Sequence, residues 1–414
     1  MPTAAPDDWA AFYQDLHRHP ELAFQETRTG GLVAERLAAS GFEVAAGVGG
    51  TGVVGVLRNG DGPTALLRAD MDALPVQERT GLPYASTQRA LDADGNDVPV
   101  MHACGHDIHV ACLLGACQTL AGQRETWAGT LLAVFQPAEE VGDGAGAMVR
   151  DGLFDRFGRP DVVLGQHVAP IPAGIIALRP GPAFAAADSL RITLYGRGAH
   201  ASRPGASVDP VVMAAATVLR LQTIVSRELA AGESAVVTVS SIRAGSAGNV
   251  IPDEAELLVS VRTFAAGVRT RILAAIERIV RAEAAASDAP RPPKIENTAS
   301  FPAVVNDPAA ADRTRPALLT VSPLVIDPGP VTGNEDVGVL ADAAGAPCVY
   351  WLLGGADPAA FDGATTMAEL TERVRALPSN HSPLYAPVIE PTLGTGMRAL
   401  VAAAQAWLPK ADAA

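Results

Sequence analysis

The chain has 414 residues, of which 48% are hydrophobic and 18% are charged, the composition of a packed globular protein. A single core rarely grows to this size, so we expect two domains. The net charge is −14 and no block of basic residues is present. This balance argues against a nucleic-acid partner or an anionic membrane surface.

Met1–Trp9 lacks the basic and apolar regions of a secretory signal, and no apolar run is long enough to span a bilayer. We therefore expect a cytoplasmic protein with no membrane partner. Four cysteines are too few for a disulfide framework: Cys104, Cys112, Cys117 and Cys348. A reducing compartment would keep Cys104 available as a thiolate.

Helical periodicity alternates with valine- and leucine-rich runs in the first part of the chain. Helices are predicted at Trp9–Leu22, Thr27–Ser40 and Asp107–Ala121. Strands are predicted at Val53–Leu57, Thr64–Arg68, Gly129–Phe135 and Asp161–Gly165. This alternation predicts an α/β fold with a mostly parallel, twisted sheet flanked by helices.

The pattern changes from about Phe184. Alternating strands and long helices follow in the order Ser189–Tyr195, Asp209–Leu229, Ala235–Ile242, Glu254–Thr263 and Val268–Ala286. This order predicts a small α+β domain of the β-α-β-β-α-β type, with the Pro-rich segment Asp288–Pro293 as its exit. We therefore expect a catalytic domain formed by residues 1–183 and 297–414, interrupted by a lid or dimerisation domain at 184–296.

The segment His102–His109 contains three histidines, a cysteine and an aspartate. Imidazole and thiolate are preferred ligands of zinc and related metals. A buried cluster of these groups without a metal would leave many polar atoms to satisfy. The segment therefore predicts a metal site.

Three predicted strands end in polar residues: Asp70 and Asp72, the pair Glu139-Glu140, and His167. Ligands of open α/β sheets bind at the carboxyl ends of the strands, so we expect these side chains to gather along one edge. Adjacent carboxylates point in different directions, which allows one to bind a metal while the other acts as a base.

Other patterns carry less weight. Gly47–Gly52 matches the dinucleotide fingerprint, but a predicted strand follows it where the phosphates need a helix N-terminus. Ala244–Gly248 resembles a nucleophile elbow around Ser246, but its first glycine is replaced by alanine. A cysteine hydrolase using Cys104 and His106 is disfavoured, because two residues so close in one chain make a poor nucleophile-base pair.

Five motifs together resemble the aminoacylase and hippurate-hydrolase branch of the di-metal amidohydrolase and carboxypeptidase family. They are Leu16–Leu22, Arg68–Pro75, Met101–Asp107, Gln136–Glu140 and Gly196–Ser202. The motifs occur in the family's order, and the resemblance extends from about residue 10 to 408. Within the branch, Leu221–Glu228 and Pro302–Asp307 are most similar to actinobacterial N-acyl-amino-acid aminoacylases of the N-acyl-glutamine type.

The resemblance implies up to two divalent metal ions per subunit, with the Cys104 sulfur bridging them. The implied ligands are Cys104, His106, Glu140, His167 and His381. Glu139 would be the general base. Asp70, Asp72 and Asp107 would orient imidazoles from behind. The metal stays open between zinc, manganese and cobalt, because affinity order and cellular supply decide it.

The resemblance also assigns roles to residues of the inserted domain. It implies a homodimer in which His200 reaches the partner subunit's active site and stabilises the oxyanion. Asn249 and Arg262 match residues that hold the substrate's α-carboxylate. The chain departs from the family pattern after His381, where Pro383–Pro387 replaces an aromatic-rich stretch, so the acyl pocket differs.

The sequence thus predicts a metal-dependent enzyme that hydrolyses the amide of a small N-acyl amino acid to a carboxylic acid and a free amino acid. An exopeptidase acting on dipeptides is the alternative, because the same site hydrolyses either amide. A non-catalytic binding protein on the same scaffold is the alternative from another class.

Overall fold

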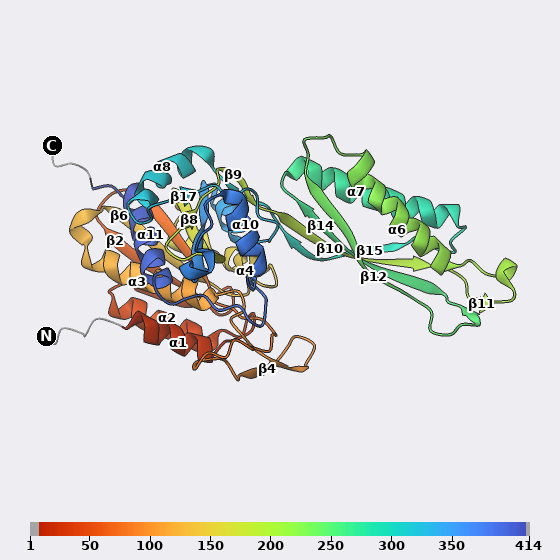
Figure 1. Cartoon of the computed structure of the whole chain (residues 1–414), viewed down its shortest axis with the longest axis horizontal. Coiled ribbons are helices and arrows are strands. Elements are labelled where there is room, and N and C mark those ends of the chain that lie inside the picture. Colours follow the sequence, from red (N-terminus) through yellow and green to blue (C-terminus); the bar gives the residue numbers. More distant parts are fainter. Residues whose placement is uncertain (1–7, 411–414) are drawn as a thin grey trace. The chain divides into compact units, whose positions relative to one another are not determined.

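The computed structural model describes residues 8–410, apart from the side chain of Met367. Residues 1–7, on which the expected lack of a secretory signal largely depends, lie outside this range. The described chain forms two compact units (Figure 1). The first unit comprises residues up to 181 together with 305–329 and 336–410, and the second comprises 182–304 and 330–335. None of the helices within residues 8–410 has both the length and the apolar character needed to cross a bilayer.

An eight-stranded sheet forms the centre of the first unit. Its strands, in spatial order, are β1 (Glu43–Val48), β2 (Gly52–Asn59), β6 (Gly129–Gln136), β3 (Thr64–Asp70), β7 (Val162–Pro172), β18 (Cys348–Ala356), β8 (Ile176–Ala177) and β17 (Val325–Ile326). The four central strands β6, β3, β7 and β18 run parallel, whereas β1, β2 and β6 pair antiparallel. The predicted α/β fold with a mostly parallel sheet is confirmed.

Helices cover both faces of this sheet. One face carries α1 (Trp9–Arg18), α2 (Thr27–Ala39), α3 (His106–Gly122), α8 (Pro308–Leu319) and α11 (Thr392–Trp407). The opposite face carries α4 (Gly144–Arg150) and α9 (Val337–Ala344), with α5 (Leu153–Phe157) beside α4. Alternate residues of each strand point to opposite faces, so Leu67 and Leu164 enter the apolar core under α3 and α11. Arg68 and Gly165 point to the other face.

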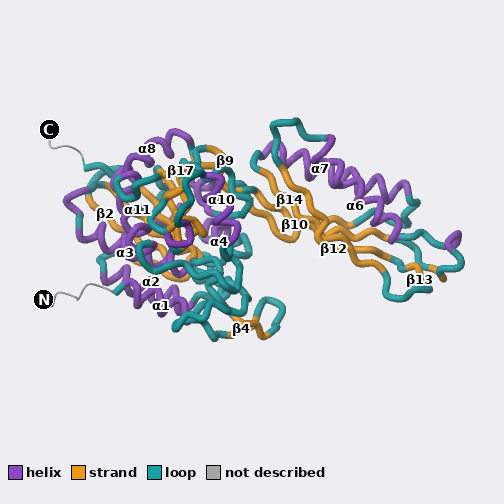
Figure 2. Tube along the Cα trace, in the orientation of Figure 1, coloured by secondary structure: helices purple, strands orange, loops and turns teal. Residues whose placement is uncertain are grey.

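Shorter elements complete the first unit (Figure 2). They are the hairpin β4 (Arg89–Leu91) and β5 (Asp97–Pro99), the helix α10 (Met367–Ala376), and the 3₁₀ helices η1 (Arg124–Thr126) and η3 (Pro358–Phe361). The strands β9 (Gly181–Phe184) and β16 (Val304–Asn306) lie where the chain passes from one unit to the other.

Two predicted elements end more than two residues away from their predicted ends. Helix α1 ends at Arg18 and not at Leu22, because Pro20 disfavours helical backbone at the residue before it. Strand β7 continues to Pro172, so His167 lies within the strand and not beyond its end at Gly165. The glycine-rich segment ending at Gly52 is followed by strand β2, as predicted.

The second unit has an antiparallel sheet with the order β12-β14-β10-β15. Its elements in chain order are β10 (Ala186–Tyr195), α6 (Pro210–Arg227), β12 (Ala235–Ala244), β14 (Glu254–Thr263), α7 (Ala266–Ala286) and β15 (Lys294–Phe301). The helices α6 and α7 pack on one face of the sheet and form a separate apolar core with it. A small β11 (Ala199–His200) and β13 (Val250–Ile251) pair, with η2 (Pro204–Ala206) nearby, extends this unit.

Candidate metal centre

Parallel pairing brings the polar strand residues into one row. Strand β3 pairs with β6 so that Asp70 lies opposite Gln136. It also pairs with β7 so that Arg68 lies opposite Gly165, which places Asp70 level with His167. Residues separated by almost a hundred positions therefore meet at the edge of the sheet that the strand patterns predict.

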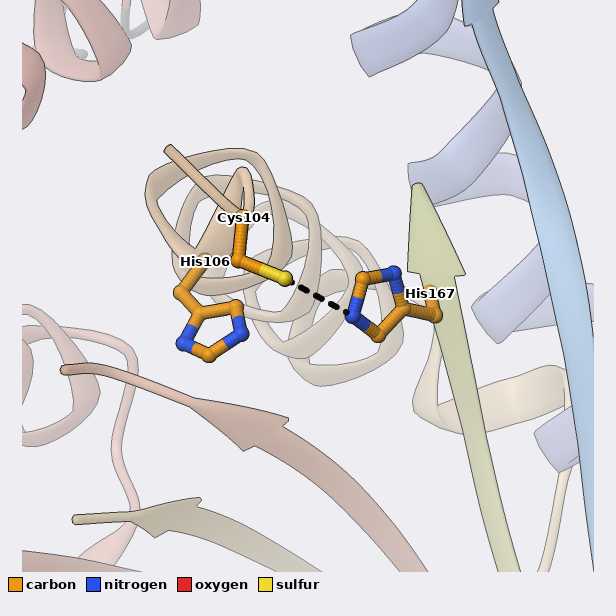
Figure 3. Close-up of side chains that lie close together, drawn as sticks. All are labelled: Cys104, His106 and His167. Atoms are coloured by element: carbon orange, nitrogen blue, oxygen red, sulfur yellow. Dashed lines mark hydrogen bonds between the residues drawn. The ribbon is translucent and has the colours of Figure 1, made fainter. Parts of the chain in front are cut away.

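A tight turn before α3 sets the directions of Cys104 and His106. Gly105 between them has a φ of +80°, and a Cβ atom there would lie 2.4 Å from Cγ1 of Val168. Both the backbone conformation and the close approach require glycine. Figure 3 shows the Cys104 sulfur pointing toward the ring of His167, and the distance from Sγ to Nε2 is 3.5 Å.

The five predicted ligands form two groups that share Cys104. One group is Cys104, His106 and His167, and the other is Cys104, Glu140 and His381. Within each group the possible ligand atoms lie within 4.8 Å of one another. A third group joins Glu139 to His106 and Glu140 within the same limit. The first unit therefore brings together all five predicted ligands and the predicted base.

The arrangement fits divalent metal ions. Nε2 of His106 and Oε1 of Glu140 are buried and make no hydrogen bond among residues 8–410. They lie 3.8 Å from each other, and Oδ2 of Asp70 lies 3.7 Å from the same His106 nitrogen, so carboxylate oxygens surround Nε2 beyond hydrogen-bond range. Buried polar atoms without partners are costly, and native proteins rarely keep them unless another group binds there. The combination of thiolate, imidazole and carboxylate suits zinc and related transition metals.

Charge coupling within the cluster is strong. Hydrogen bonds with Cys104 and Glu140 raise the pKa of His381 to about 10. Burial opposes ionisation of Glu140, but the hydrogen bond with His381 and the field of His106 lower its pKa. Burial and the charge of Glu140 raise the pKa of Cys104. A divalent cation competes with these protons, so metal binding by such a cluster depends on pH.

Two aspartates support the cluster from behind. Asp72 Oδ1 lies 3.2 Å from Nδ1 of His106, and its Oδ2 accepts a 2.9 Å hydrogen bond from the backbone N–H of Glu140. Asp70 accepts a 2.6 Å hydrogen bond from the buried Arg68 guanidinium and binds Nδ1 of His109. A histidine whose Nδ1 is fixed by a carboxylate presents its other nitrogen in a defined orientation.

Asp107 has a different partner from the other two aspartates. Its Oδ2 lies 2.6 Å from Nδ1 of His17, and Nε2 of His17 lies 3.2 Å from Glu78. Asp107 therefore contacts the imidazole of His17 and not that of a predicted ligand. Burial disfavours protonation of His17, but the two carboxylates outweigh it and raise its pKa to about 10. This buried ion-pair network ties helix α1 to the start of α3.

Sequence reasoning missed three residues that hold the site together. His109 accepts a 2.8 Å hydrogen bond from the N–H of Val168, the residue after His167. Asn380 donates to the carbonyls of Cys104 and Val168, at 3.2 Å each. Tyr385 donates to the same Val168 carbonyl at 3.2 Å. The density of histidines in His102–His109 could have indicated His109, but no sequence pattern marks Tyr385.

The predicted residues of the second unit lie at two separate places within it. His200 on β11 pairs with Val250 on β13, directly after Asn249, and its Nδ1 lies 2.7 Å from the Ser202 hydroxyl. Both His200 and Asn249 are exposed. Arg262 lies near the far end of β14 from this tip, roughly 26 Å along the strand at 3.3 Å per residue, and donates a 2.6 Å hydrogen bond to Asn334.

Comparisons with known proteins show the family to which the chain belongs. Residues 66–378 match the family described as peptidase family M20/M25/M40. The chain is 38% identical to the N-acetyl-L-cysteine deacetylase of Bacillus subtilis strain 168, over 78% of this chain and 74% of that protein. It is 38% identical to the hippurate hydrolase of Campylobacter jejuni, over 82% and 85% of the two chains.

A solved structure of the YXEP protein from Bacillus subtilis is also similar, with a TM-score of 0.76, 28% identity and coverage of 97% of each chain. That protein is described as a dinuclear metal binding peptidase from the M20 family. The aminoacylase and hippurate-hydrolase resemblance is therefore confirmed. The chain belongs to peptidase family M20/M25/M40 and is a hydrolytic enzyme of its amidohydrolase branch.

Proposed function

We propose that this enzyme hydrolyses the amide bond of N-acyl amino acids, releasing a carboxylic acid and a free amino acid. The sharing of Cys104 between two groups of possible ligand atoms, with Glu139 close to one member of each group, is the observation that carries the proposal. It fits a site for two divalent cations with a carboxylate base at their side. N-acetyl-L-cysteine deacetylase and hippurate hydrolase, which act on such amides by name, are among the relatives.

Cys104, His106, Glu140, His167 and His381 would hold the metals. Zinc, manganese or cobalt bound there would polarise the scissile carbonyl and lower the pKa of water toward neutrality. Glu139 takes a proton from the attacking water as the new C–O bond forms, and then delivers it to the nitrogen as the C–N bond breaks. Glu139 is only 5% exposed, which keeps bulk water away from this proton transfer.

The second unit would supply the remaining contacts. His200 donates to the developing oxyanion of a partner subunit's substrate, so the active enzyme is a homodimer. Asn249 and Arg262 bind the free α-carboxylate of the substrate. Exposure of His200 and Asn249 on a short two-stranded tip supports a role in which their partners come from outside their own unit.

The exopeptidase alternative stays open, because the family takes its name from peptidases and one similar structure is described as a peptidase. Turnover of N-acetyl amino acids, hippurate, an N-acyl-glutamine and several dipeptides would separate the two. Cleavage of dipeptides alone would reject the acyl-amino-acid substrate class.

The role of Glu139 is tested by Glu139→Gln, which keeps the shape and removes the base. We expect turnover to fall about 100- to 10,000-fold while the metal content stays that of the wild type. A chelator should inactivate the wild-type enzyme and added metal should restore it. Undiminished turnover by Glu139→Gln would refute the proposed base.

A further inference from the structure

Glu26 is a fully buried carboxylate outside the set of residues considered so far. Its Oε1 accepts hydrogen bonds from two backbone N–H groups, that of Phe24 at 3.0 Å and that of Ala138 at 2.8 Å. Its Oε2 accepts a short hydrogen bond from the Thr51 hydroxyl. The side chain thus joins three segments of the first unit, and the most distant of them leads directly into Glu139.

Helix α2 does not explain this carboxylate. Glu26 stands at the N-cap position, but its side chain makes no capping hydrogen bond to the described helix. Glu21 performs that task instead, because its two oxygens accept from the N–H groups of Arg28 and Thr29 at 2.8 Å each. The side chain of Glu26 therefore binds Phe24, Thr51 and Ala138, and not the N-terminus of the helix.

Ala138, the residue directly before Glu139, has an unusual backbone conformation. Its φ is +52°, in the left-handed region that residues other than glycine rarely adopt. Such strain persists only where the surroundings fix it. The N–H of Ala138 is held by Glu26, and its carbonyl accepts a 3.1 Å hydrogen bond from Gly144. After the turn, Asp72 holds the N–H of Glu140.

We propose that Glu26 is a positioning residue for the Glu139-Glu140 pair, acting through the N–H of Ala138. Glu26 fixes the backbone before the pair and Asp72 fixes it after the pair, so the two carboxylates leave the chain in set directions. The inference rests on the proposed roles of Glu139 as base and Glu140 as metal ligand. It predicts that a residue with no contact to substrate or metal controls both proton transfer and metal affinity.

A hydrogen-bond acceptor is what this position requires, and not a negative charge. Burial and the nearby charge of Asp72 raise the pKa of Glu26 to about 7, so both protonation states are accessible near neutral pH. In either state Oε1 continues to accept from Phe24 and Ala138. Glutamine retains this acceptor, and its NH₂ group can donate to the Thr51 hydroxyl.

The test compares four single variants with the wild type in the full chain: Glu26→Ala, Glu26→Asp, Glu26→Gln and Glu21→Ala. The measurements are kcat and KM with hippurate or the best N-acyl amino acid, the affinity of the metal-free protein for Zn²⁺ and Mn²⁺ by calorimetry, and unfolding in urea. Glu21→Ala is the matched control, because it weakens the start of the same helix and leaves the Ala138 turn intact.

We expect Glu26→Ala to lower kcat about 10- to 100-fold with little change in KM, and to weaken metal binding by a similar factor. Glu26→Asp is one methylene too short to reach both N–H groups and should show the same loss. It replaces Glu26→Ala as the test if the alanine variant does not fold. Glu26→Gln should keep most of the wild-type kcat. Adding Ala138→Gly to Glu26→Ala should restore part of it, because glycine adopts a positive φ without strain.

Wild-type kcat and metal affinity in Glu26→Ala or Glu26→Asp would overturn the inference and leave Glu26 with a structural role only. A loss in Glu26→Gln as large as in Glu26→Ala would also overturn it. A separate result tests the proposed function: undiminished turnover by Glu139→Gln would contradict it. An inactive Glu139→Gln together with an unaffected Glu26→Ala would reject the positioning role alone.

Discussion

The cluster around Cys104 and the three predicted residues of the second unit differ in how firmly the fold holds them. Cys104 and His106 are buried, and Asp72 fixes the His106 ring from behind. His200 and Asn249 are exposed on a short two-stranded tip and are held there by local hydrogen bonds. The first site is held by contacts within its own unit, whereas the proposed roles of His200 and Asn249 call for a substrate or another subunit as their partner.

The largest effect should come from the first site. Cys104→Ala removes the atom common to both groups of ligands, so we expect loss of metal and a fall in turnover of at least about 1,000-fold. The fold should persist, because the side chain lies at a sheet edge and not in the main core. Elemental analysis and circular dichroism of the purified variant check both points.

Cys117→Ala is the matched control for that experiment. Cys117 lies on the same helix α3 but in the apolar core, so this variant should lose some stability and keep its metal. Full metal content in Cys104→Ala would contradict the shared-sulfur arrangement.

A smaller effect is expected at the tip of the second unit. His200→Ala should lower kcat about 100- to 1,000-fold, the usual cost of one oxyanion donor, while leaving metal content unchanged. His19→Ala, which changes a half-exposed histidine near Asp15, should have wild-type kinetics. Loss of metal in His200→Ala would mean that metal binding depends on the tip of the second unit as well as on the first site. Mixing His200→Ala with inactive Glu139→Gln subunits should restore activity if His200 acts across a dimer.

Arg262 should have a smaller effect, mainly on substrate binding. Arg262→Lys keeps the charge but loses the fork that matches a carboxylate, so KM should rise about tenfold with kcat nearly unchanged. The rise should vanish for a substrate whose α-carboxylate is an amide. Arg191→Lys, an exposed arginine paired with Glu256 on neighbouring strands, is the control. An unchanged KM in Arg262→Lys would place the carboxylate site elsewhere.

Local patterns predicted most of the fold and part of the cluster around Cys104. Strand β14 begins and ends as predicted at Glu254 and Thr263, because its alternation is regular over its whole length. Cys104 and His106 could be identified from the sequence because they lie two residues apart in His102–His109, a segment unusually rich in histidine. The boundaries at α1 and β7 were less accurate, since apolar periodicity says little about where a neighbouring strand or a proline stops an element.

The supporting residues could not be predicted for a physical reason. Glu26 acts on Ala138 across 112 positions and His17 acts on Asp107 across 90, so each contact exists only once the sheet order has brought the segments together. The positive φ at Ala138 and at His381 likewise occurs where a long-range hydrogen bond holds the backbone N–H, to Glu26 and to the Ala103 carbonyl respectively. Periodicity and composition therefore do not predict which distant segments contact and position the residues of a site.

The ion pairs of His17 with Glu78 and Asp107 make the stability of the first unit depend on pH. The pKa of His17 is about 10 in the folded protein and about 6.5 in an unfolded chain. The folded state therefore binds the proton more tightly, so the stabilisation is complete below pH 6.5 and is lost as pH rises toward 10. The groups facing His17 are Asp107, Glu78, Tyr13, Tyr84 and His102.

His17→Gln should lower the free energy of unfolding by about 3 to 5 kcal/mol at pH 6, because it leaves Asp107 and Glu78 buried without their cation. The difference from the wild type should shrink as pH rises from 6.5 to 10, as followed by urea unfolding at several pH values. His19→Gln, which changes a half-exposed histidine paired with Asp15, is the matched control. A pH-independent difference between His17→Gln and wild type would mean that His17 is neutral, and that packing and not charge joins α1 to the helix carrying His106.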